Sequence, residues 1–167
     1  MNESIDQYKA RILSNTEGKE SLDIQRQTPA SLASLIHGCD LNSLRRSPHP
    51  GKWSAVQIIM HLAETEIVAS WRYRQMLEQS ATNIIPYDQD QWERLGDYAN
   101  ANPQDALELF RLLRERNLQL LARLTPQQWD MYGIHGERGK ESVRVLVRMM
   151  AGHDVNHLNQ VRDILKA

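Results

Sequence analysis

The sequence has one cysteine, Cys39, and one phenylalanine. A single cysteine excludes an internal disulfide and fits a reducing compartment, and a small half-buried residue is a simpler interpretation of Cys39 than a nucleophile. No apolar run reaches the roughly 18 residues of a membrane-spanning helix. The N-terminus also lacks the basic and apolar segments of a signal peptide. We therefore expect a cytoplasmic protein without a membrane partner.

An excess of charge of one sign is also missing. The chain contains 20 Lys and Arg residues against 21 Asp and Glu residues, and no basic patch or tail stands out. Nucleic-acid binding therefore has no electrostatic support. A length of 167 residues suits one domain with a proper hydrophobic core. We expect a single domain over residues 1–167, of which 1–19 form an N-terminal extension.

Signals for β-strands are scarce. Runs of β-branched residues are few, no stretch alternates convincingly between apolar and polar residues, and no Asn-Gly or Asp-Gly pair marks a hairpin. Leu, Gln, Arg and Glu are abundant and favour helix. The composition therefore predicts an all-α fold.

Apolar spacing predicts one short helix and four long ones. The short helix covers 3–14, and the long helices cover 20–37, 54–79, 103–124 and 141 to nearly the end. Ser54 is a candidate N-cap, and Pro103 suits the first turn of the third long helix. Thr28-Pro29 interrupts the first long helix, where a kink and a fresh first turn are both open. In the third long helix, we expect the inward face to consist of Leu107, Phe110, Leu113, Leu120 and Leu121.

The connections between these helices have unequal lengths. Residues 83–102, between the second and third long helices, form an irregular segment that is long for a bundle, and such segments often cover a site. Residues 133–140 hold three glycines and predict a turn or loop. The whole pattern predicts a four-helix bundle with a short N-terminal helical extension.

The last helix carries His153 and His157, four residues apart. Four helical residues advance about 400°, so the two imidazoles lie on one face and can bind one metal ion, although chance also produces this spacing. His61, among apolar residues of the second long helix, is the candidate third ligand. Alone it would be a hydrogen-bonded core residue, but three imidazoles among apolar neighbours are costly unless a metal or hydrogen bonds satisfy them. His37, His49 and His135 are weaker candidates, and His135 fits a pocket residue better than a ligand.

Three segments together resemble the DinB/YfiT-like superfamily. They are GKWS at 51–54 with Gln57, HLAETE at 61–66 and Arg72; YDQDQW at 87–92; and HDVNHLNQ at 153–160. The resemblance runs from about residue 22 to 165 and is specific as a set. It implies a bundle that is usually dimeric and holds a divalent metal with three histidines, here His61, His153 and His157. Relatives often carry Glu where this chain has Gln57, so a charged role there is in doubt.

The resemblance also implies a reaction. Characterised members include S-transferases and isomerases that use low-molecular-weight thiols such as bacillithiol or mycothiol. Three neutral histidines leave an ion with its full charge and an open position, which suits activation of a thiol or water. We therefore expect a metal-dependent enzyme that transfers a small thiol to an electrophilic small molecule. Zinc, nickel or iron would suit the site.

Two other functions stay open at this point. One is a metal-containing binding or stress-response module without turnover, and the other is a metal-assisted hydrolase. A protease of the H-E-x-x-H type is a poor match, because Asp154 replaces the glutamate and only ten residues follow His157.

Five further residues join the candidate site, of which Arg72 and Gln160 follow from helix phase. Gln57 and Gln160 are expected to orient a ligand or water, or to link helices. Glu64 and Asp154 are expected either to accept the second N–H of a ligand histidine or to lie on a solvated face. Arg72 is placed to hold an anionic substrate group or to pair with Asp88 or Asp90, and the pairing is the favoured interpretation.

Overall fold

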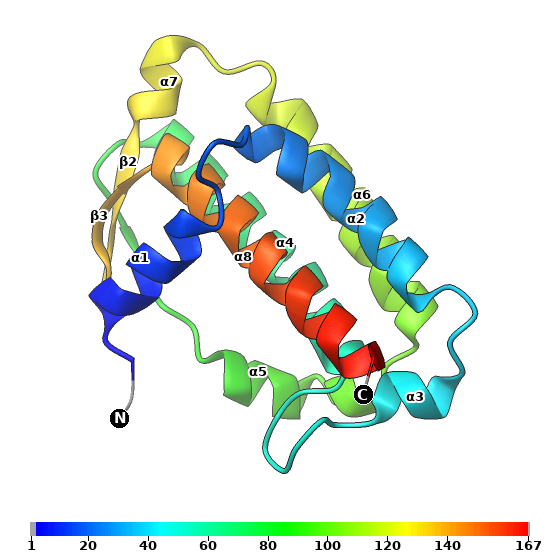
Figure 1. Cartoon of the computed structure of the whole chain (residues 1–167). Helices are drawn as coiled ribbons and strands as arrows, with labels where there is room; N and C mark the ends of the chain where they lie inside the picture. The colour runs from blue at the N-terminus through cyan, green and yellow to red at the C-terminus, as the bar shows by residue number, and fades with distance from the viewer. Residues whose placement is uncertain (1–2, 167) are drawn as a thin grey trace.

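The computed structural model describes residues 3–166 (Figure 1). Its elements are α1 (Ile5–Ser14), α2 (Ser21–Ile36), α3 (Leu41–Arg45), α4 (Ala55–Glu78), β1 (Thr82–Ile84), α5 (Gln89–Leu95), the 3-10 helix η1 (Tyr98–Asn100), α6 (Pro103–Leu121), α7 (Pro126–Asp130), β2 (Tyr132–His135), β3 (Gly139–Ser142) and α8 (Val143–Lys166). The four predicted long helices correspond to α2, α4, α6 and α8. The predicted helical bundle is therefore confirmed, and no helix within residues 3–166 is long and apolar enough to cross a membrane.

Local capping explains where two of the long helices begin. The Ser54 hydroxyl accepts a hydrogen bond from the backbone N–H of Gln57, and the Gln57 side chain accepts one from the backbone N–H of Ser54. This reciprocal capping satisfies two N–H groups that the first turn of α4 would leave free. Pro103 is the first residue of α6, where a missing N–H costs nothing, and Asn102 caps that helix.

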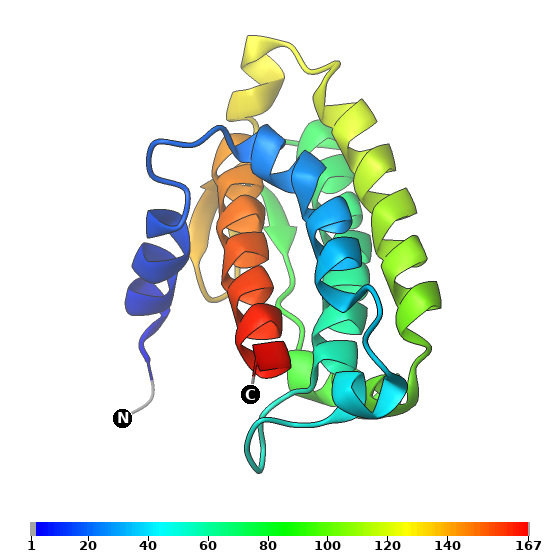
Figure 2. The ribbon, with the colours of Figure 1, turned by 45° about the vertical axis from the view of Figure 1, so that its right-hand side comes forward.

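The long helices form a ring in which sequence neighbours are not always spatial neighbours. α2 and α4 each pack against both α6 and α8, so α2 lies diagonally opposite α4 (Figure 2). α4 and α6 run in the same direction (Figure 1). The chain must therefore return along the length of the bundle between them. This return explains the long predicted connection, which contains β1, α5 and η1.

The structure also contains a small sheet, which the sequence analysis did not predict. β2 pairs in parallel with β1 and antiparallel with β3, and His135 is paired with Ile84. The strands are three or four residues long, so they are too short for an alternating pattern to be visible in the sequence. The sheet packs against α4 and α8 and places the segment after β1 beside the end of β2.

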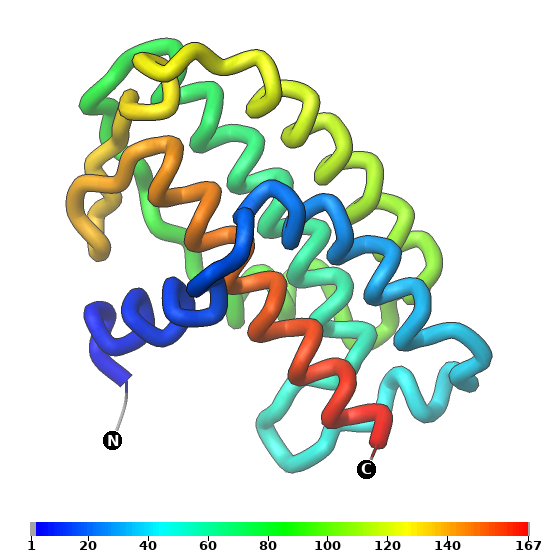
Figure 3. Tube along the Cα trace, turned by 45° about the horizontal axis from the view of Figure 1, so that its top comes forward, coloured from blue at the N-terminus to red at the C-terminus, as the bar shows by residue number. Residues whose placement is uncertain are grey.

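The N-terminal helix α1 lies outside the ring and crosses α8 (Figure 3). A glycine permits this contact, because a Cβ at Gly152 would lie 2.0 Å from the carbonyl oxygen of Ile12. The side-chain amide of Asn15 donates to the Gly152 carbonyl oxygen over 3.0 Å. The close approach brings Tyr8 of α1 over the region where His153 lies.

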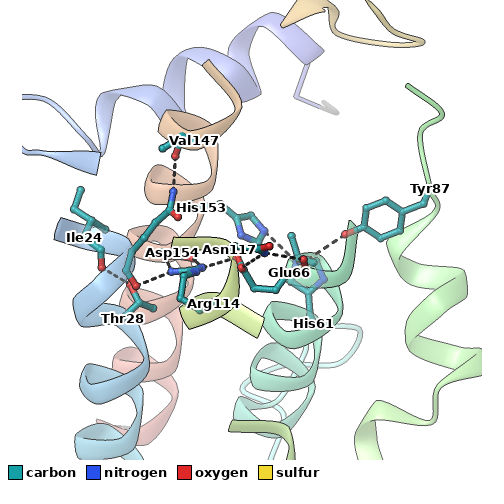
Figure 4. A network of polar contacts seen from close by, with 12 residues as sticks. Ile24, Thr28, His61, Glu66, Tyr87, Arg114, Asn117, Val147, His153 and Asp154 are labelled. Atoms are coloured by element: carbon teal, nitrogen blue, oxygen red, sulfur yellow. Dashed lines mark hydrogen bonds and ion pairs between the residues drawn. The ribbon is translucent and has the colours of Figure 1, made fainter. Parts of the chain in front are cut away.

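A buried polar layer separates two apolar clusters of the bundle core. At its centre is Arg114 of α6, which donates to Glu66 of α4 over 2.8 Å and to Asp154 of α8 over 3.0 Å (Figure 4). All three side chains are at most 2% exposed. Burial alone would lower the pKa of Arg114, but the two carboxylates outweigh it and raise that pKa above its usual value. The layer thus pairs one cation with two carboxyl groups, and burial raises the pKa of Asp154 although Arg114 opposes the shift. Asn117 donates to the second oxygen of Glu66 over 2.8 Å.

The fourth helix joins this layer through a proline. α2 continues without interruption through Pro29, so the helix neither ends nor restarts there. Because proline has no N–H, the carbonyl of Gln25, four residues earlier, lacks its helical partner. Arg114 supplies the missing hydrogen bond by donating to the Gln25 carbonyl oxygen over 2.8 Å.

The inward face of α6 differs from the predicted one. Its buried residues are Pro103, Ala106, Phe110, Arg114, Asn117 and Leu121. Of the five residues expected to face inward, Phe110 and Leu121 are buried, whereas Leu107, Leu113 and Leu120 are only half-buried. The prediction was offset because it considered apolar residues alone and left Arg114 and Asn117 out of the inward face.

We predict that Arg114→Met destabilises the protein by about 3–5 kcal/mol, because it leaves two carboxylates buried without a cation. Chemical denaturation followed by circular dichroism measures the loss. The control is Arg111→Met on the same helix, where an exposed arginine pairs with Glu108 and Glu115, and its denaturation midpoint should hardly move.

The loss of stability caused by Arg114→Met should also become smaller as the pH falls. Unpaired buried carboxylates have raised pKa values, so the folded variant takes up protons before the unfolded chain does. Equal, small effects of the two substitutions at pH 7 would show that the layer does not depend on Arg114.

Candidate metal centre

The side chains of His61, His153 and His157 meet between α4 and α8. The Nε2 atom of His153 lies 3.0 Å from the Nε2 atom of His61 and 3.0 Å from that of His157. One nitrogen from each residue lies within 4.8 Å of the other two. The spacing of the two histidines on α8 and the depth of His61 on α4 therefore bring the three predicted residues together.

The surroundings keep all three imidazoles neutral. Burial lowers the pKa of His61 to about 3, helped by the nearby His157. Burial also lowers the pKa of His157 to about 4, although Gln160 opposes the shift. The pKa of His153 lies well below its usual value for the same reason and because it faces the other two rings. Neutral imidazoles keep the lone pairs that a metal ion requires.

The orientation of two of the rings is fixed by neighbours. The Nδ1–H of His157 donates to Oε1 of Gln160 over 2.7 Å, so Nε2 of His157 is the unprotonated nitrogen. This is the support that metal-binding histidines commonly receive from a second residue. The Trp53 ring lies 4.9 Å from the His61 ring, centroid to centroid, and shields that side of the cluster.

The cluster fits a divalent cation. His153 Nε2 approaches two other ring nitrogens at once, and one shared proton cannot bridge both gaps. Three neutral nitrogens converging on one point suit zinc, iron or nickel, and they leave coordination positions open. No cysteine joins them, since Cys39 packs against the apolar cluster of α2, α4 and α6. The role of the three histidines as metal ligands stays a prediction at this point.

The other histidines do not join the cluster. His37 is exposed at the end of α2, and His49 lies in the loop before α4. His135 is 2% exposed at the end of β2 and lines a cavity that His61 and His153 also line.

Gln57 makes no hydrogen bond to His61. Its amide oxygen accepts from the Ser54 N–H over 2.8 Å, and its amide nitrogen donates to Oε1 of Glu93 over 2.7 Å. It therefore links the start of α4 to α5. A glutamate at position 57 would face Glu93 with a like charge, which gives a physical reason for glutamine in this chain.

Neither candidate carboxylate accepts a hydrogen bond from a histidine of the cluster. Glu64 accepts a hydrogen bond from the Tyr98 hydroxyl, and Asp154 is held by Arg114 in the polar layer. Asp154 is fully buried, so the solvated alternative is wrong for it as well. Its contribution to the site is indirect, because it fixes the position of the neighbouring His153 on α8.

Arg72 does not pair with Asp88 or Asp90, so the favoured pairing is wrong. Its Nη2 donates to the carbonyl oxygen of Ile85 over 3.3 Å. Asp88 instead caps α5 by accepting from the backbone N–H groups of the second and third residues of that helix.

Two cavities adjoin the histidine cluster. Cavity A, of about 270 Å³, is lined by His61 and His153 together with Thr65, Arg72, Tyr87 and His135. Cavity B, of about 650 Å³, is lined by His153 and His157 together with Trp53, Asn156 and Gln160. A larger groove of about 870 Å³ between α2 and α6 contains none of these histidines. The cluster is therefore reachable from two sides.

Sequence reasoning missed several residues around the site. Thr65 lies one turn after His61, and its Oγ1 is 3.5 Å from His61 Nε2 and 3.2 Å from the Tyr87 hydroxyl. Helix phase could have found Thr65, since four residues return to the same face. Arg114 and Glu66 could have been found from their inward phase on α6 and α4. Nothing local places Tyr87 beside α4.

The chain is similar to proteins that are already known. A family model of the DinB superfamily matches residues 25–161. YfiT of Bacillus subtilis is 26% identical over 163 residues, which cover 96% of this chain and 91% of YfiT. The protein OB0782 of Oceanobacillus iheyensis is 31% identical over 129 residues, covering 76% of this chain and 74% of that protein. Both are named as candidate metal-dependent hydrolases.

The fold of YfiT is also similar. Its solved structure matches with a TM-score of 0.82 at 22% identity, covering 98% of this chain and 88% of YfiT, and it is described as an unusual four-helix bundle. The structural match supports the fold, and the sequence match covers α4 and all three histidines. This chain belongs to the DinB superfamily.

Proposed function

We propose that the protein is a metal-dependent enzyme in which His61, His153 and His157 hold a divalent ion that activates a small thiol. The observation that carries the proposal is the convergence of three neutral Nε2 atoms between two cavities. An ion held there acts as a Lewis acid and lowers the pKa of a coordinated thiol or water toward neutrality. Action on a small molecule, as a homodimer in the cytoplasm, stays a prediction.

The residues around the cluster have separate tasks in this proposal. The three histidines hold the ion without adding negative charge, and Gln160 fixes the ring of His157. Trp53 restricts the access of water to His61. The hydroxyls of Thr65 and Tyr87, 3.2 Å apart, lie beside His61 and can donate to an oxygen of the electrophile. In the transfer, a sulfur–carbon bond forms as the leaving group departs, and the thiol proton passes to solvent.

The neighbouring carboxylates favour a thiol over water. A water nucleophile in H-E-x-x-H enzymes relies on an adjacent carboxylate as general base. The carboxylates nearest in sequence to the histidines are otherwise engaged: Glu66 and Asp154 bind Arg114, and Glu64 binds Tyr98. A coordinated thiol is deprotonated outright, whereas coordinated water keeps a pKa of about 7, so a thiol depends less on such a base.

A second candidate function is hydrolysis of a small substrate. It is favoured by a specific observation, since the relatives from Bacillus subtilis and Oceanobacillus iheyensis are named as candidate metal-dependent hydrolases. The same histidine cluster would serve, with water as the nucleophile.

We predict that His157→Ala lowers affinity for zinc and nickel by more than about 100-fold, because it removes a ligand rather than a residue supporting one. Gln160→Ala should have a smaller effect, on the order of 10–100-fold, because it frees the ring of His157. Competition with a chromogenic chelator on untagged protein measures both.

The matched control for metal binding is His37→Ala, which removes an exposed histidine outside the cluster. It should bind metal like the wild type, and circular dichroism should show that all three variants stay helical. Unchanged affinity in a helical His157→Ala protein would contradict the ligand assignment.

We predict that the metal-free protein loses stability as the pH falls from about 6.5 toward 4. The pKa values of His61 and His157 are lowered to about 3 and about 4 in the folded state. Over this interval the unfolded chain therefore binds protons that the folded chain does not, so stability rises with pH. Urea denaturation at several pH values measures the slope.

His157→Ala provides the comparison for the pH dependence, because it removes one of the histidines but none of the carboxylates that titrate in the lower part of the interval. Its stability should depend less steeply on pH between 6.5 and 5. Identical slopes in the two proteins would mean that His157 is not held neutral by its burial.

We predict thiol-dependent turnover that requires the metal. Bacillithiol, mycothiol, glutathione and cysteine are each tested with monochlorobimane, in which sulfur replaces chloride, and p-nitrophenyl acetate tests hydrolysis. At least one thiol should be consumed faster than without enzyme, and chelation or His157→Ala should abolish the difference. Metal-dependent ester cleavage without thiol consumption would favour the hydrolase, and metal binding without either reaction would favour a binding module.

A further inference from the structure

His135 presents a buried hydrogen-bond donor that the proposed metal chemistry does not use. Its Nδ1 accepts from the backbone N–H groups of Glu137 and Arg138, over 3.2 and 3.3 Å. Burial lowers the pKa of His135 to about 4, with help from Arg138 and Arg72, so the ring is neutral. A neutral ring whose Nδ1 accepts carries its proton on Nε2. That Nε2 is buried and has no partner within residues 3–166.

Arg72 provides a buried positive charge without a carboxylate partner in the described part of the chain. Its side chain is 7% exposed, and its one hydrogen bond there is to the Ile85 carbonyl. Arg138, on the same cavity, is different because Glu141 accepts from its Nε and Nη2 over 2.7 and 2.9 Å. Glu137 also lines cavity A, but it is exposed and forms an ion pair with neither arginine. Arg72 is therefore the arginine of this lining that lacks an ion pair, and burying such a charge without a partner is costly.

Both groups lie in the cavity that reaches the histidine cluster. Arg72 and His135 line cavity A together with His61 and His153. The Tyr87 ring lies between the two ends, since its hydroxyl contacts Thr65 beside His61 and its ring centroid is 5.9 Å from Cζ of Arg72. His61 and Arg72 are eleven residues apart on α4, about 16 Å along the axis, but the longer arginine side chain leans back toward the N-terminus of the helix and so toward His61. Because Tyr87 lies close to both Thr65 and Arg72, one small molecule that lies along its ring can reach both ends.

We propose that Arg72 and the Nε2–H of His135 bind a carboxylate of the substrate, while the reacting end of the same molecule faces the histidine cluster. One arginine without an ion pair matches one negative charge, and the planar guanidinium fork matches a carboxylate. A phosphate dianion would find no second free cation, because Glu141 already neutralises Arg138. Leu146, Met149 and Met150 supply an apolar wall for the chain that joins the two ends. The inference rests on the proposed function, because it assigns the carboxylate to that enzyme's substrate.

Hexanoate is the probe, with hexanamide and inorganic phosphate as comparisons. Calorimetry with the chelated protein measures binding without a metal that could itself coordinate the carboxylate, and the metal-loaded protein is measured beside it. Hexanoate should bind at least about tenfold more tightly than hexanamide, as a charge-assisted pair predicts. Phosphate should bind more weakly than hexanoate.

Three variants assign the binding to its residues. Arg72→Met should weaken hexanoate binding at least about tenfold. His135→Asn keeps an oxygen for the two backbone N–H groups and removes the Nε2 donor, and it should weaken binding less than Arg72→Met does. Arg74→Met is the matched control, since Arg74 lies two residues further on α4 and is exposed; it should bind like the wild type.

The possible results separate this inference from the proposed function. His157→Ala should lose the metal yet keep hexanoate binding, so failure of the metal site leaves the carboxylate site measurable. Equal affinities for hexanoate and hexanamide, or wild-type affinity in Arg72→Met, would overturn the inference while metal binding stands. Tighter binding of phosphate than of hexanoate would overturn the assignment to a carboxylate.

Discussion

Arg114 places one positive charge in the interior of the bundle and forms hydrogen bonds with groups on the three other long helices. Glu66 comes from α4, Asp154 from α8, and the Gln25 carbonyl from α2, where Pro29 leaves that carbonyl free. Apolar side chains could pack in several registers, but buried ions tolerate only the register in which each is paired. The layer therefore sets how far each helix extends past its neighbours, whatever net stability it contributes.

The register of α4 against α8 is what the histidine cluster requires. Glu66 follows His61 by five residues, and Asp154 directly follows His153. Fixing the two carboxylates on one guanidinium therefore fixes the depths at which the imidazoles project from the facing helices. A slip of one turn would move a ring by about 5.4 Å, more than the 3.0 Å that separates the nitrogens. Asp154 and Glu66 thus support the site without touching it.

The features that sequence could predict are those encoded locally. The helices, the Ser54 cap, Pro103 and the pairing of His153 with His157 each follow from spacing within one segment. The offset inward face of α6 shows the limit, because a buried arginine looks like a surface residue until its partners are known. The sheet shows the same limit of local sequence information. β1 and β2 are separated by nearly fifty residues, and only their pairing brings Tyr87 and His135 to one cavity.

The distribution of charge connects these elements to chemistry. Within residues 3–166 each buried carboxylate is paired with an arginine, Glu66 and Asp154 with Arg114 and Glu141 with Arg138. Cavity A therefore has neutral histidines at one end and, at the other, Arg72 without an ion pair beside the exposed Glu137. A divalent ion on the histidines would add to the positive potential rather than cancel it. Low-dielectric walls strengthen that potential and draw in anions. In the proposal made above, the arginine that orders the bundle thereby contributes to the preference for a negatively charged substrate, because it occupies Glu66 and Asp154.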